Sequence, residues 1–535
     1  MNSFGFCMNR RNVLAGLAAL AAAPRIALAQ GESPVVATSG GTVRGLITTN
    51  GIASYRGIPY GAPTGGANRF MPPRHAVPWT GVFDATVFGP SAPQGPPNRP
   101  PDPGRDVRTG EDCLVVNVWT PAPTRSARRP VMVWLHGGGF ITGSATPALY
   151  DGANLARLGD VVVVSLNHRL NAFGYTYLGG VGGADFADSG NVGQLDIVQA
   201  LGWVRDNIEA FGGDPSRVTI FGESGGGLKT AALLATPPAA RLFHRAIIES
   251  GPGIRMASLE DQDRVARELM MELSFAKNDM KALQTVPAAD LHKAFGVVNA
   301  RHPPRGAGFI SIFAPTIDGR SLPHHPFDPS APTVSSTVPL MIGSNHTEAT
   351  LFGVARDKYD VTEAEIGPLL KGLVGPDVDD VVAGYRKALP NASPWDLMIL
   401  INTDIPTSAF SREIARRKTE AGGAPAWLYR FDWETPVGRM RAPHTIEMPF
   451  VFSNLDHSYV PLGDGPERPA LAHTMSTLWT NFARGGKPIA AGIPTWPPYD
   501  GKSRSTMLLN TQARLVNDPD QPLREISDKV LGFPA

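Results

Sequence analysis

A serine flanked by glycines stands where a predicted strand gives way to a predicted helix. The β-branched run at 217–220 predicts a short strand, and segment 221–226 (FGESGG) follows it with Ser224 at its centre. Gly222 and Gly226 leave room for a sharp, strained turn that exposes the serine hydroxyl above a sheet, the arrangement called a nucleophile elbow. A serine hydroxyl is a weak nucleophile near neutral pH, so it needs a base and an orienting partner before it attacks a carbonyl.

A second glycine-rich turn lies upstream of this serine. The apolar run at 131–135 predicts a buried strand, and it leads into His136 and the glycines at 137–139. Acyl transfer places negative charge on a carbonyl oxygen, and backbone N–H groups of such a glycine loop can approach and stabilise it. The two turns in this order predict an α/β-hydrolase fold.

The base and the acid must be chosen from many candidates, because the chain has 12 histidines. In this fold the order along the chain is serine, then acid, then histidine. His444 lies beyond the last long apolar strand candidate, at 426–431, whereas His473 lies in a segment with an amphipathic helical pattern. Glu348 follows a predicted strand at 338–343, and Asp318 occupies an Asp-Gly pair that is typical of a simple turn. Spacing favours Glu348 and His444 but leaves Asp318 and His473 open.

The chain resembles the type-B carboxylesterase/lipase family, which includes bacterial p-nitrobenzyl esterases, animal carboxylesterases and cholinesterases. The resemblance covers almost the whole mature chain, and its matching stretches lie at 55–60, 69–70, 110–114, 167–170, 190–196, 211–215, 479–483 and 496–497. It implies an α/β fold with a central, mostly parallel sheet flanked by helices and with helical cap insertions. Length alone would suggest three domains, but the resemblance implies a single domain over residues 30–535.

The resemblance also implies roles for particular residues. Ser224 would attack the ester carbonyl while a histidine takes its proton, and an acid would orient that histidine. The implied triad is Ser224, Glu348 and His444, and the implied oxyanion hole consists of the N–H groups of Gly138, Gly139 and Gly225.

Three positions depart from the pattern of this family. Gly225 replaces the alanine that usually follows the serine, and Ala349 replaces the glycine that usually follows the acid. Lys229 places a charge one turn into the elbow helix, where a small or apolar residue is expected. A buried ion pair is the preferred explanation of Lys229, rather than a catalytic role.

Composition excludes several classes of function. The net charge is +1 and no basic block occurs, which argues against nucleic acid as a partner. The sequence has no Walker-type loop, no CxxC pair and no HExxH motif, so we expect no cofactor and no metal. The expected partner is a small-molecule ester, and the sequence gives no oligomeric state.

The first 29 residues have the pattern of a cleaved export signal. Arg10 and Arg11 precede a modestly apolar segment at 13–23, and an A-x-A site at 27–29 predicts cleavage before Gln30. The paired arginines favour the twin-arginine pathway, with general export as the alternative. The apolar run is too short to span a bilayer, so we expect a periplasmic or secreted protein without a stable membrane anchor.

Removal of this signal would also remove Cys7 and leave Cys113 as the only cysteine. The mature chain can therefore form no internal disulfide. The prolines of the loop 92–110 are expected to restrain it in place of a crosslink, because they limit the freedom of the unfolded chain. No tryptophan occurs between Trp79 and Trp119, whereas cholinesterases place one in this loop to bind quaternary ammonium. Hydrolysis of choline esters as a dedicated role is therefore disfavoured.

The substrate pockets are expected to be lined by Phe140, by the region after Ser250 and Gly251, and by the insertion at 256–309. Within that insertion, 264–273 has the pattern of a surface helix over the cleft. Three alternatives to a carboxylesterase are weighed: an acyltransferase that uses the same acyl-enzyme, a long-chain lipase, and a family member that only binds. The last is improbable because the nucleophile, acid, base and glycine loop are all present.

Overall fold

The structure is a computed structural model, and it describes residues 33–96, 102, 105, 108–276, 278–303, 310–352 and 359–534. The predicted signal at 1–29 lies outside these residues. None of the helices within the described ranges is both long and apolar enough to cross a membrane.

An eleven-stranded sheet forms the centre of the molecule, in the order β14-β13-β12-β11-β10-β9-β7-β8-β6-β4-β3. Neighbouring strands run parallel from β13 to β8 and antiparallel at both edges, so the prediction of a mostly parallel sheet is confirmed. Its strands are β3 (Leu46–Ile47), β4 (Ala53–Pro59), β6 (Val115–Thr120), β7 (Arg129–Leu135), β8 (Val162–Leu166), β9 (Gly213–Glu223), β10 (Arg245–Glu249), β11 (Leu340–Asn345), β12 (Ala426–Phe431), β13 (Ser505–Leu509) and β14 (Arg514–Asn517). A small separate sheet contains β1 (Val36–Thr38), β2 (Gly41–Arg44) and β5 (Val82–Asp84).

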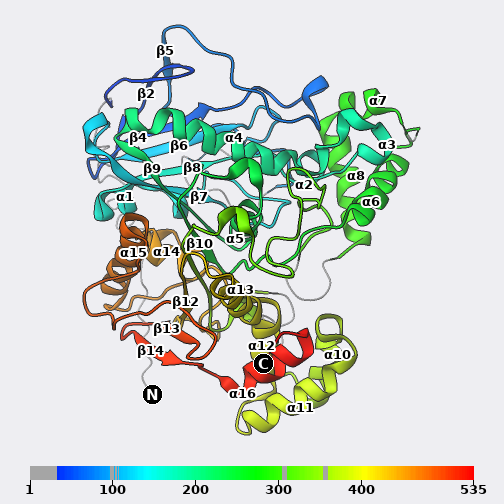
Figure 1. Ribbon diagram of the computed structural model, residues 1–535, viewed down its shortest axis with the longest axis vertical. Helices are drawn as coiled ribbons and strands as arrows, with labels where there is room; N and C mark the ends of the chain where they lie inside the picture. Colours follow the sequence, from blue (N-terminus) through cyan, green and yellow to red (C-terminus); the bar gives the residue numbers. More distant parts are fainter. Residues whose placement is uncertain are drawn as a thin grey trace, which may run out of the picture.

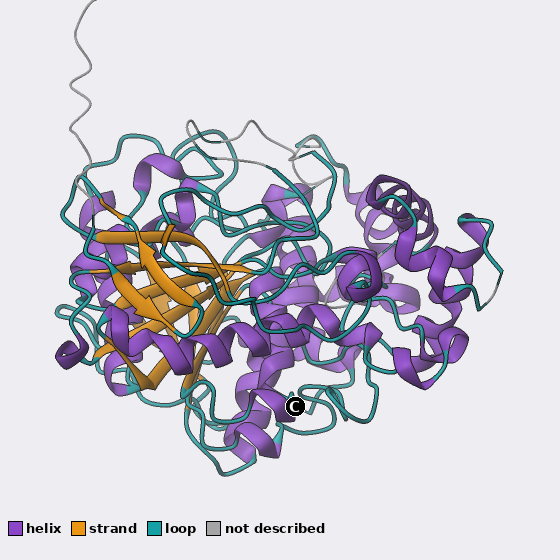
Figure 2. Cartoon of the chain, turned by 90° about the horizontal axis from the view of Figure 1, so that it is seen from above, coloured by secondary structure: helices purple, strands orange, loops and turns teal. Residues whose placement is uncertain are grey.

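Helices cover both faces of the large sheet (Figures 1 and 2). The helices are α1 (Ala153–Gly159), α2 (Asn171–Gly174), α3 (Gly179–Gly182), α4 (Val192–Asn207), α5 (Gly225–Leu234), α6 (Leu259–Glu272), α7 (Met280–Thr285), α8 (Ala288–Arg301), α10 (Glu363–Val374), α11 (Val378–Ala388), α12 (Pro394–Thr403), α13 (Ala409–Glu420), α14 (Met448–Val451), α15 (Arg468–Gly485) and α16 (Gln521–Leu531).

Side chains of the central strands point alternately to the two faces of the sheet, which explains why helices cover both faces. In β7, Val131 and Val133 join an apolar cluster with α4, α5 and α13, whereas Met132 and Trp134 join a second cluster with α1, α14 and α15. Successive side chains of a strand point to opposite faces, so an uninterrupted apolar strand requires helices on each side.

Two groups of helices lie beside the sheet, and each has an apolar cluster of its own. Helices α6, α7 and α8 form the upper group in Figure 1, and α10, α11, α12 and α16 form the lower group. Apart from α16, which follows the last strand, these helices correspond to the helical insertions that the family resemblance implies. The lower group is the one that contributes to the candidate site below.

The predicted strands are found, with some boundaries moved. Strand β12 has the predicted bounds, while β9 is longer than the predicted run at 217–220 because Phe221, Gly222 and Glu223 continue to pair with β10. Strand β11 begins two residues later than predicted and continues to Asn345, which pairs with Phe431 of β12.

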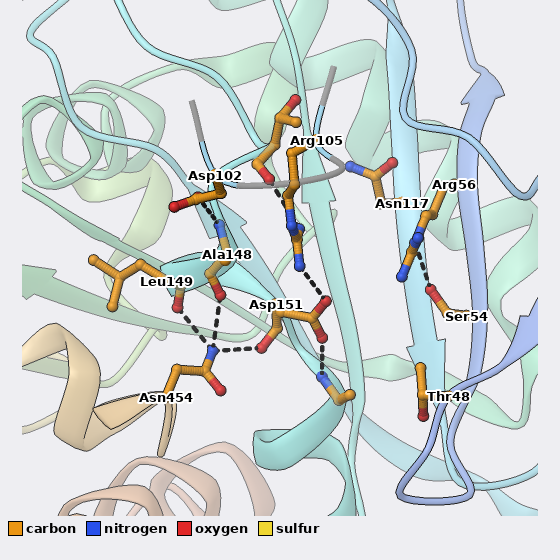
Figure 3. Close-up of polar contacts among 12 residues, drawn as sticks. Thr48, Ser54, Arg56, Asp102, Arg105, Asn117, Ala148, Leu149, Asp151 and Asn454 are labelled. Atoms are coloured by element: carbon orange, nitrogen blue, oxygen red, sulfur yellow. Dashed lines mark hydrogen bonds and ion pairs between the residues drawn. The ribbon is translucent and has the colours of Figure 1, made fainter. Parts of the chain in front are cut away.

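The loop 92–110 is held by polar contacts, and Cys113 is a buried free thiol. Arg105 donates to Asp151 at 2.7 Å, and Asp102 accepts from the N–H of Ala148 at 2.6 Å (Figure 3). Asn454 donates to the carbonyls of Leu149 and Asp151 in the same segment, both at 2.9 Å. Charge-assisted hydrogen bonds therefore anchor the described residues Asp102 and Arg105 of this loop.

Candidate active site

The predicted elbow joins the end of β9 to the start of α5. Ser224 has φ 56° and ψ −119°, a backbone conformation that is strained for a residue with a side chain. A Cβ at Gly222 would lie 2.6 Å from the backbone of Gly226, and one at Gly226 would lie 1.9 Å from the carbonyl oxygen of Leu135. The glycines are therefore required because strand and helix backbones touch at this turn.

The glycine loop follows β7 and lies against the same turn. Gly138 has φ 88° and Gly139 has φ 62°, so both occupy the left-handed region that glycine adopts without cost. A Cβ at Gly225 would lie 2.2 Å from the nitrogen of Gly139. Within the described ranges, the N–H groups of Gly138, Gly139 and Gly225 have no hydrogen-bond acceptor in the protein. They are thus available to a substrate oxygen.

His444 is oriented by Glu348. Its Nδ1 lies 2.6 Å from Oε2 of Glu348, and the two side chains are almost fully buried. The other carboxylate oxygen, Oε1, accepts from the Ser250 hydroxyl and from the N–H of Asn345, both at 2.6 Å. Because these two donors bind Oε1, Oε2 is directed at the imidazole, and the carboxylate of Glu348 is held in one orientation.

Glu223, the residue before the serine, contacts the opposite side of the same imidazole. Its Oε1 lies 3.0 Å from Nε2 of His444. Burial acts to lower the pKa of His444, but the carboxylates of Glu223 and Glu348 outweigh it and raise that pKa well above its ordinary value. No role for Glu223 was expected from the sequence, although its position next to Ser224 in the elbow places it beside any base that serves this serine.

Two further carboxylates lie buried behind this pair. Burial and the nearby charges of Glu223 and Glu348 raise the pKa of Glu447 well above its usual range, and Glu447 accepts from the Asn345 amide at 2.5 Å. Burial also raises the pKa of Glu249 to about 8, while Trp479 donates to Glu249 at 3.0 Å. Burial therefore favours the neutral form of both carboxyl groups.

Ser224 and His444 line one cavity of about 520 Å³. Gly139, Gly225 and Glu348 also reach this cavity, and most of its remaining wall is apolar. The other lining residues are Leu228, Ser250, Gly251, Pro252, Ala349, Phe352, Leu369, Leu370, Leu373, Met398, Asn402, Pro406 and Thr407. The site thus has the expected chemical groups at the base of an apolar chamber.

The expectation for the pocket wall was partly wrong. The region after Ser250 contributes as predicted, but Phe140 is fully buried in the cluster of α6, α7 and α8 and lies outside the cavity wall. The described part of 256–309, which includes the predicted surface helix, contributes no lining residue either. Helices α10 and α12 supply that wall instead, through Leu369, Leu370, Leu373, Met398 and Asn402.

Asp318 and His473, the alternative candidates for the acid and the base, lie away from Ser224. Asp318 accepts from the N–H groups of Arg320 and Leu322, at 2.8 and 2.9 Å, and so stabilises its own turn. His473 is exposed on α15, as its amphipathic pattern predicts. Neither lines the cavity that contains Ser224.

Lys229 is fully buried, and the expected ion pair is absent within the described residues. Its Nζ donates to the carbonyl oxygen of His136 at 2.8 Å, and burial lowers its pKa to about 7. A backbone carbonyl thus takes the place of the carboxylate that was expected. The described residues also contain no group of three or more His, Cys, Asp or Glu side chains that could hold a metal ion.

A serine on a strand-to-helix turn, above a mostly parallel sheet with helices on both faces, defines the α/β-hydrolase class. The model of the carboxylesterase family matches residues 32–367 and 390–525. The chain is 37% identical to the para-nitrobenzyl esterase of Bacillus subtilis over 92% of this chain and 98% of that protein. It is 34% identical to the phenmedipham hydrolase of Pseudarthrobacter oxydans over 91% of this chain and 98% of that protein.

Solved structures agree with this match. The carboxylesterase of Geobacillus stearothermophilus superimposes with a TM-score of 0.81 at 34% identity, over 92% of this chain and 99% of that one. The chain belongs to the carboxylesterase family, and it is an enzyme that hydrolyses carboxylic esters.

Proposed function

We propose that this enzyme hydrolyses small to medium carboxylic esters through an acyl-enzyme on Ser224. His444 accepts the serine proton as Oγ attacks the carbonyl carbon, and it later passes that proton to the leaving alcohol. Water then repeats the sequence on the acyl-enzyme and releases the acid. Glu348 holds Nδ1 of the imidazole and stabilises its cationic form, while the N–H groups of Gly138, Gly139 and Gly225 form the oxyanion hole.

The observation that carries this proposal is the position of Ser224 and His444 in the wall of one cavity, with the imidazole held by Glu348. The three free N–H groups beside the serine provide further support. The apolar wall favours uncharged acyl and alcohol groups, and a volume of about 520 Å³ suits esters of modest size rather than extended lipids. A long-chain lipase is therefore the less favoured alternative.

Labelling with an organophosphate, followed by peptide mass spectrometry, tests the nucleophile. We expect one modified residue, Ser224, together with loss of esterase activity in proportion to labelling. Modification at another residue, or none in active enzyme, would overturn the assignment. Activity across a panel of acyl lengths, with and without competing alcohols, then separates hydrolysis of modest esters from lipase and acyltransferase activity.

The proposal includes export from the cytoplasm. It is supported by Arg10 and Arg11 ahead of a short apolar segment and by the A-x-A site before Gln30. The twin-arginine pathway carries folded proteins, and the proposed destination is the periplasm or the medium.

A further inference from the structure

The strongest unexplained feature near the site is a buried lysine that pairs with no acid in the described part of the chain. Lys229 lies on α5, one turn beyond Ser224, and its side chain is fully buried. A buried ammonium without a counter-charge is costly, because burial disfavours the charged form of a lysine. No residue of the proposed mechanism requires this group, so its position calls for another explanation.

The contacts of Lys229 lead to the glycine loop. Its Nζ donates to the carbonyl oxygen of His136 at 2.8 Å, and Nδ1 of the His136 ring lies 2.8 Å from the carbonyl oxygen of Gly137. That second carbonyl belongs to the same planar peptide as the N–H of Gly138. In a trans peptide the carbonyl and the N–H point in opposite directions, so fixing the Gly137 oxygen also fixes the Gly138 N–H.

The ring of His136 donates to the Gly137 carbonyl through Nδ1, because a carbonyl oxygen can only accept. The rings of His136 and His168 stack with centroids 5.2 Å apart, and both are fully buried. Burial and the charge of Lys229 lower the pKa of each histidine well below its ordinary value. A neutral His136 that carries its proton on Nδ1 donates to the Gly137 carbonyl.

We propose that Lys229 is a positioning residue for the oxyanion hole: its hydrogen bond to the His136 carbonyl fixes the first peptides of the glycine loop and thereby aims the Gly138 N–H at the substrate oxygen. This inference rests on the proposed function, because it assigns Lys229 to the oxyanion hole of that mechanism. It predicts that loss of Lys229 weakens binding of the tetrahedral state and leaves binding of the ground state almost unchanged.

The groups around Nζ make the effect dependent on pH. The end of β7 contributes His136, the segment after β8 contributes His168, and α4 contributes the uncharged Gln194, which donates to the Lys229 carbonyl. Within the described residues, no carboxylate pairs with Nζ. As pH rises through about 7, Lys229 loses its proton, and the hydrogen bond to His136 changes from charge-assisted to neutral.

Lys229→Met and Lys229→Gln provide the test, with Lys418→Met as the matched control. Lys418 is also buried, and its Nζ donates to the carbonyls of Ser335 and Ser336, which precede β11 at the other end of the strands from Ser224. We expect Lys229→Met to lower kcat by about 10- to 100-fold and to change KM by less than about twofold. This loss of kcat is at most comparable to the loss on removal of an oxyanion donor. Lys229→Gln keeps a neutral donor and should lose less, whereas Lys418→Met should retain wild-type kcat.

A trifluoromethyl ketone separates positioning from a general structural effect. Ser224 Oγ adds to its carbonyl carbon, the π electron pair becomes the oxyanion, and the serine proton moves to His444. We expect the affinity of the enzyme for this ketone to fall in Lys229→Met by the same factor as kcat. We also expect the kcat of the wild type, divided by the kcat of Lys229→Gln, to decline as pH rises through about 7. An unchanged ketone affinity, or a kcat within twofold of wild type in both Lys229 variants, would overturn the inference.

Labelling of the wild-type enzyme keeps the two proposals distinguishable. If an organophosphate modifies Ser224 of the wild type while the Lys229 variants behave as wild type, only this inference fails. If Ser224 of active wild-type enzyme is not labelled, the proposed function itself fails. Circular dichroism of both variants and the control confirms that the compared proteins are folded.

Discussion

Nε2 of His444 lies 3.0 Å from Oε1 of Glu223, so the imidazole has a carboxylate at each of its two ring nitrogens. Glu348 at Nδ1 has the orienting position that the mechanism requires. Glu223 at Nε2 lies instead beside the atom that must accept the proton of Ser224. The second carboxylate therefore favours the protonated imidazole before the reaction begins.

This contact predicts the pH dependence of the enzyme. Only a neutral His444 can act as the base, and its pKa is raised by Glu223 and Glu348 despite burial, so kcat/KM should rise as pH increases through that raised value. Glu223→Gln removes one of the two charges, lowers the pKa and should move the rising limb to lower pH. Glu249→Gln is the control, because that buried carboxylate does not contact the imidazole. A limb that stays in place in Glu223→Gln would contradict this account.

The triad assignment predicts an order of losses. Ser224→Ala and His444→Ala should each lower kcat by about 10⁶-fold, because either change removes the nucleophile or its base. Glu348→Gln should lose less, roughly 10³- to 10⁴-fold, since it weakens orientation but leaves the reacting groups. Esterase assays on folded variants measure the order. Asp318 lies outside the cavity that contains Ser224, so a crippled Asp318→Asn beside an active Glu348→Gln would make the acid assignment wrong.

Gly225 predicts an unusual sensitivity to alanine. Members of the carboxylesterase family usually carry alanine after the serine, but in this chain a Cβ at position 225 would lie 2.2 Å from the Gly139 nitrogen. Gly225→Ala should displace the glycine loop and lower kcat by about 10-fold or more, because the donors of the oxyanion hole move.

The control for this substitution is another helical glycine. A Cβ at Gly202 of α4 would meet no atom within 4 Å. Gly202→Ala should leave kcat unchanged and stabilise the protein by about 0.5 to 1 kcal/mol through helix propensity. Full activity in Gly225→Ala would show that the loop accommodates a methyl group.

Lys229 also predicts how stability changes with pH. Its pKa falls from 10.5 to about 7 on burial, so the unfolded state binds more protons between about pH 7 and 10. Stability must then rise with pH across that window, and the cost of the buried charge is fully present below it. Lys229→Met should flatten this rise. Because it removes the buried charge, it should also increase the free energy of unfolding near pH 6, by about 1 to 3 kcal/mol; the lost hydrogen bond to His136 keeps this increase small. Denaturant unfolding at several pH values measures both effects, and an unchanged slope would contradict the prediction.

The export proposal makes a separate prediction. Replacement of Arg10 and Arg11 by lysine should retain the precursor in the cytoplasm, because the twin-arginine pathway requires the paired arginines. Cell fractionation followed by immunoblotting measures the distribution. Normal export of the double variant would indicate the general pathway instead.

Most of the residues proposed to carry the chemistry could be predicted from the sequence because they come at or soon after the end of a predicted strand, while His444 was chosen by its order along the chain. Ser224 follows β9, the glycine loop follows β7, and Glu348 comes soon after β11. In a parallel sheet these strand ends meet at one edge, so local patterns there specify a shared site. The mostly parallel sheet was expected from the family resemblance, whereas continuous apolar runs such as 131–135 predicted individual buried strands.

The cavity wall and the buried polar contacts were decided by tertiary packing. The helices that line the chamber, α10 and α12, lie more than 130 residues after the elbow, and their patterns do not indicate where they pack. Glu223 and Lys229 were visible in the sequence, but their partners are a histidine and a backbone carbonyl from distant segments. Local spacing indicated which groups we propose to react, whereas contacts between distant segments determined the raised pKa of His444, the hydrogen bond of Lys229 to the His136 carbonyl and the shape of the pocket, because burial and long-range proximity arise only when the chain is packed.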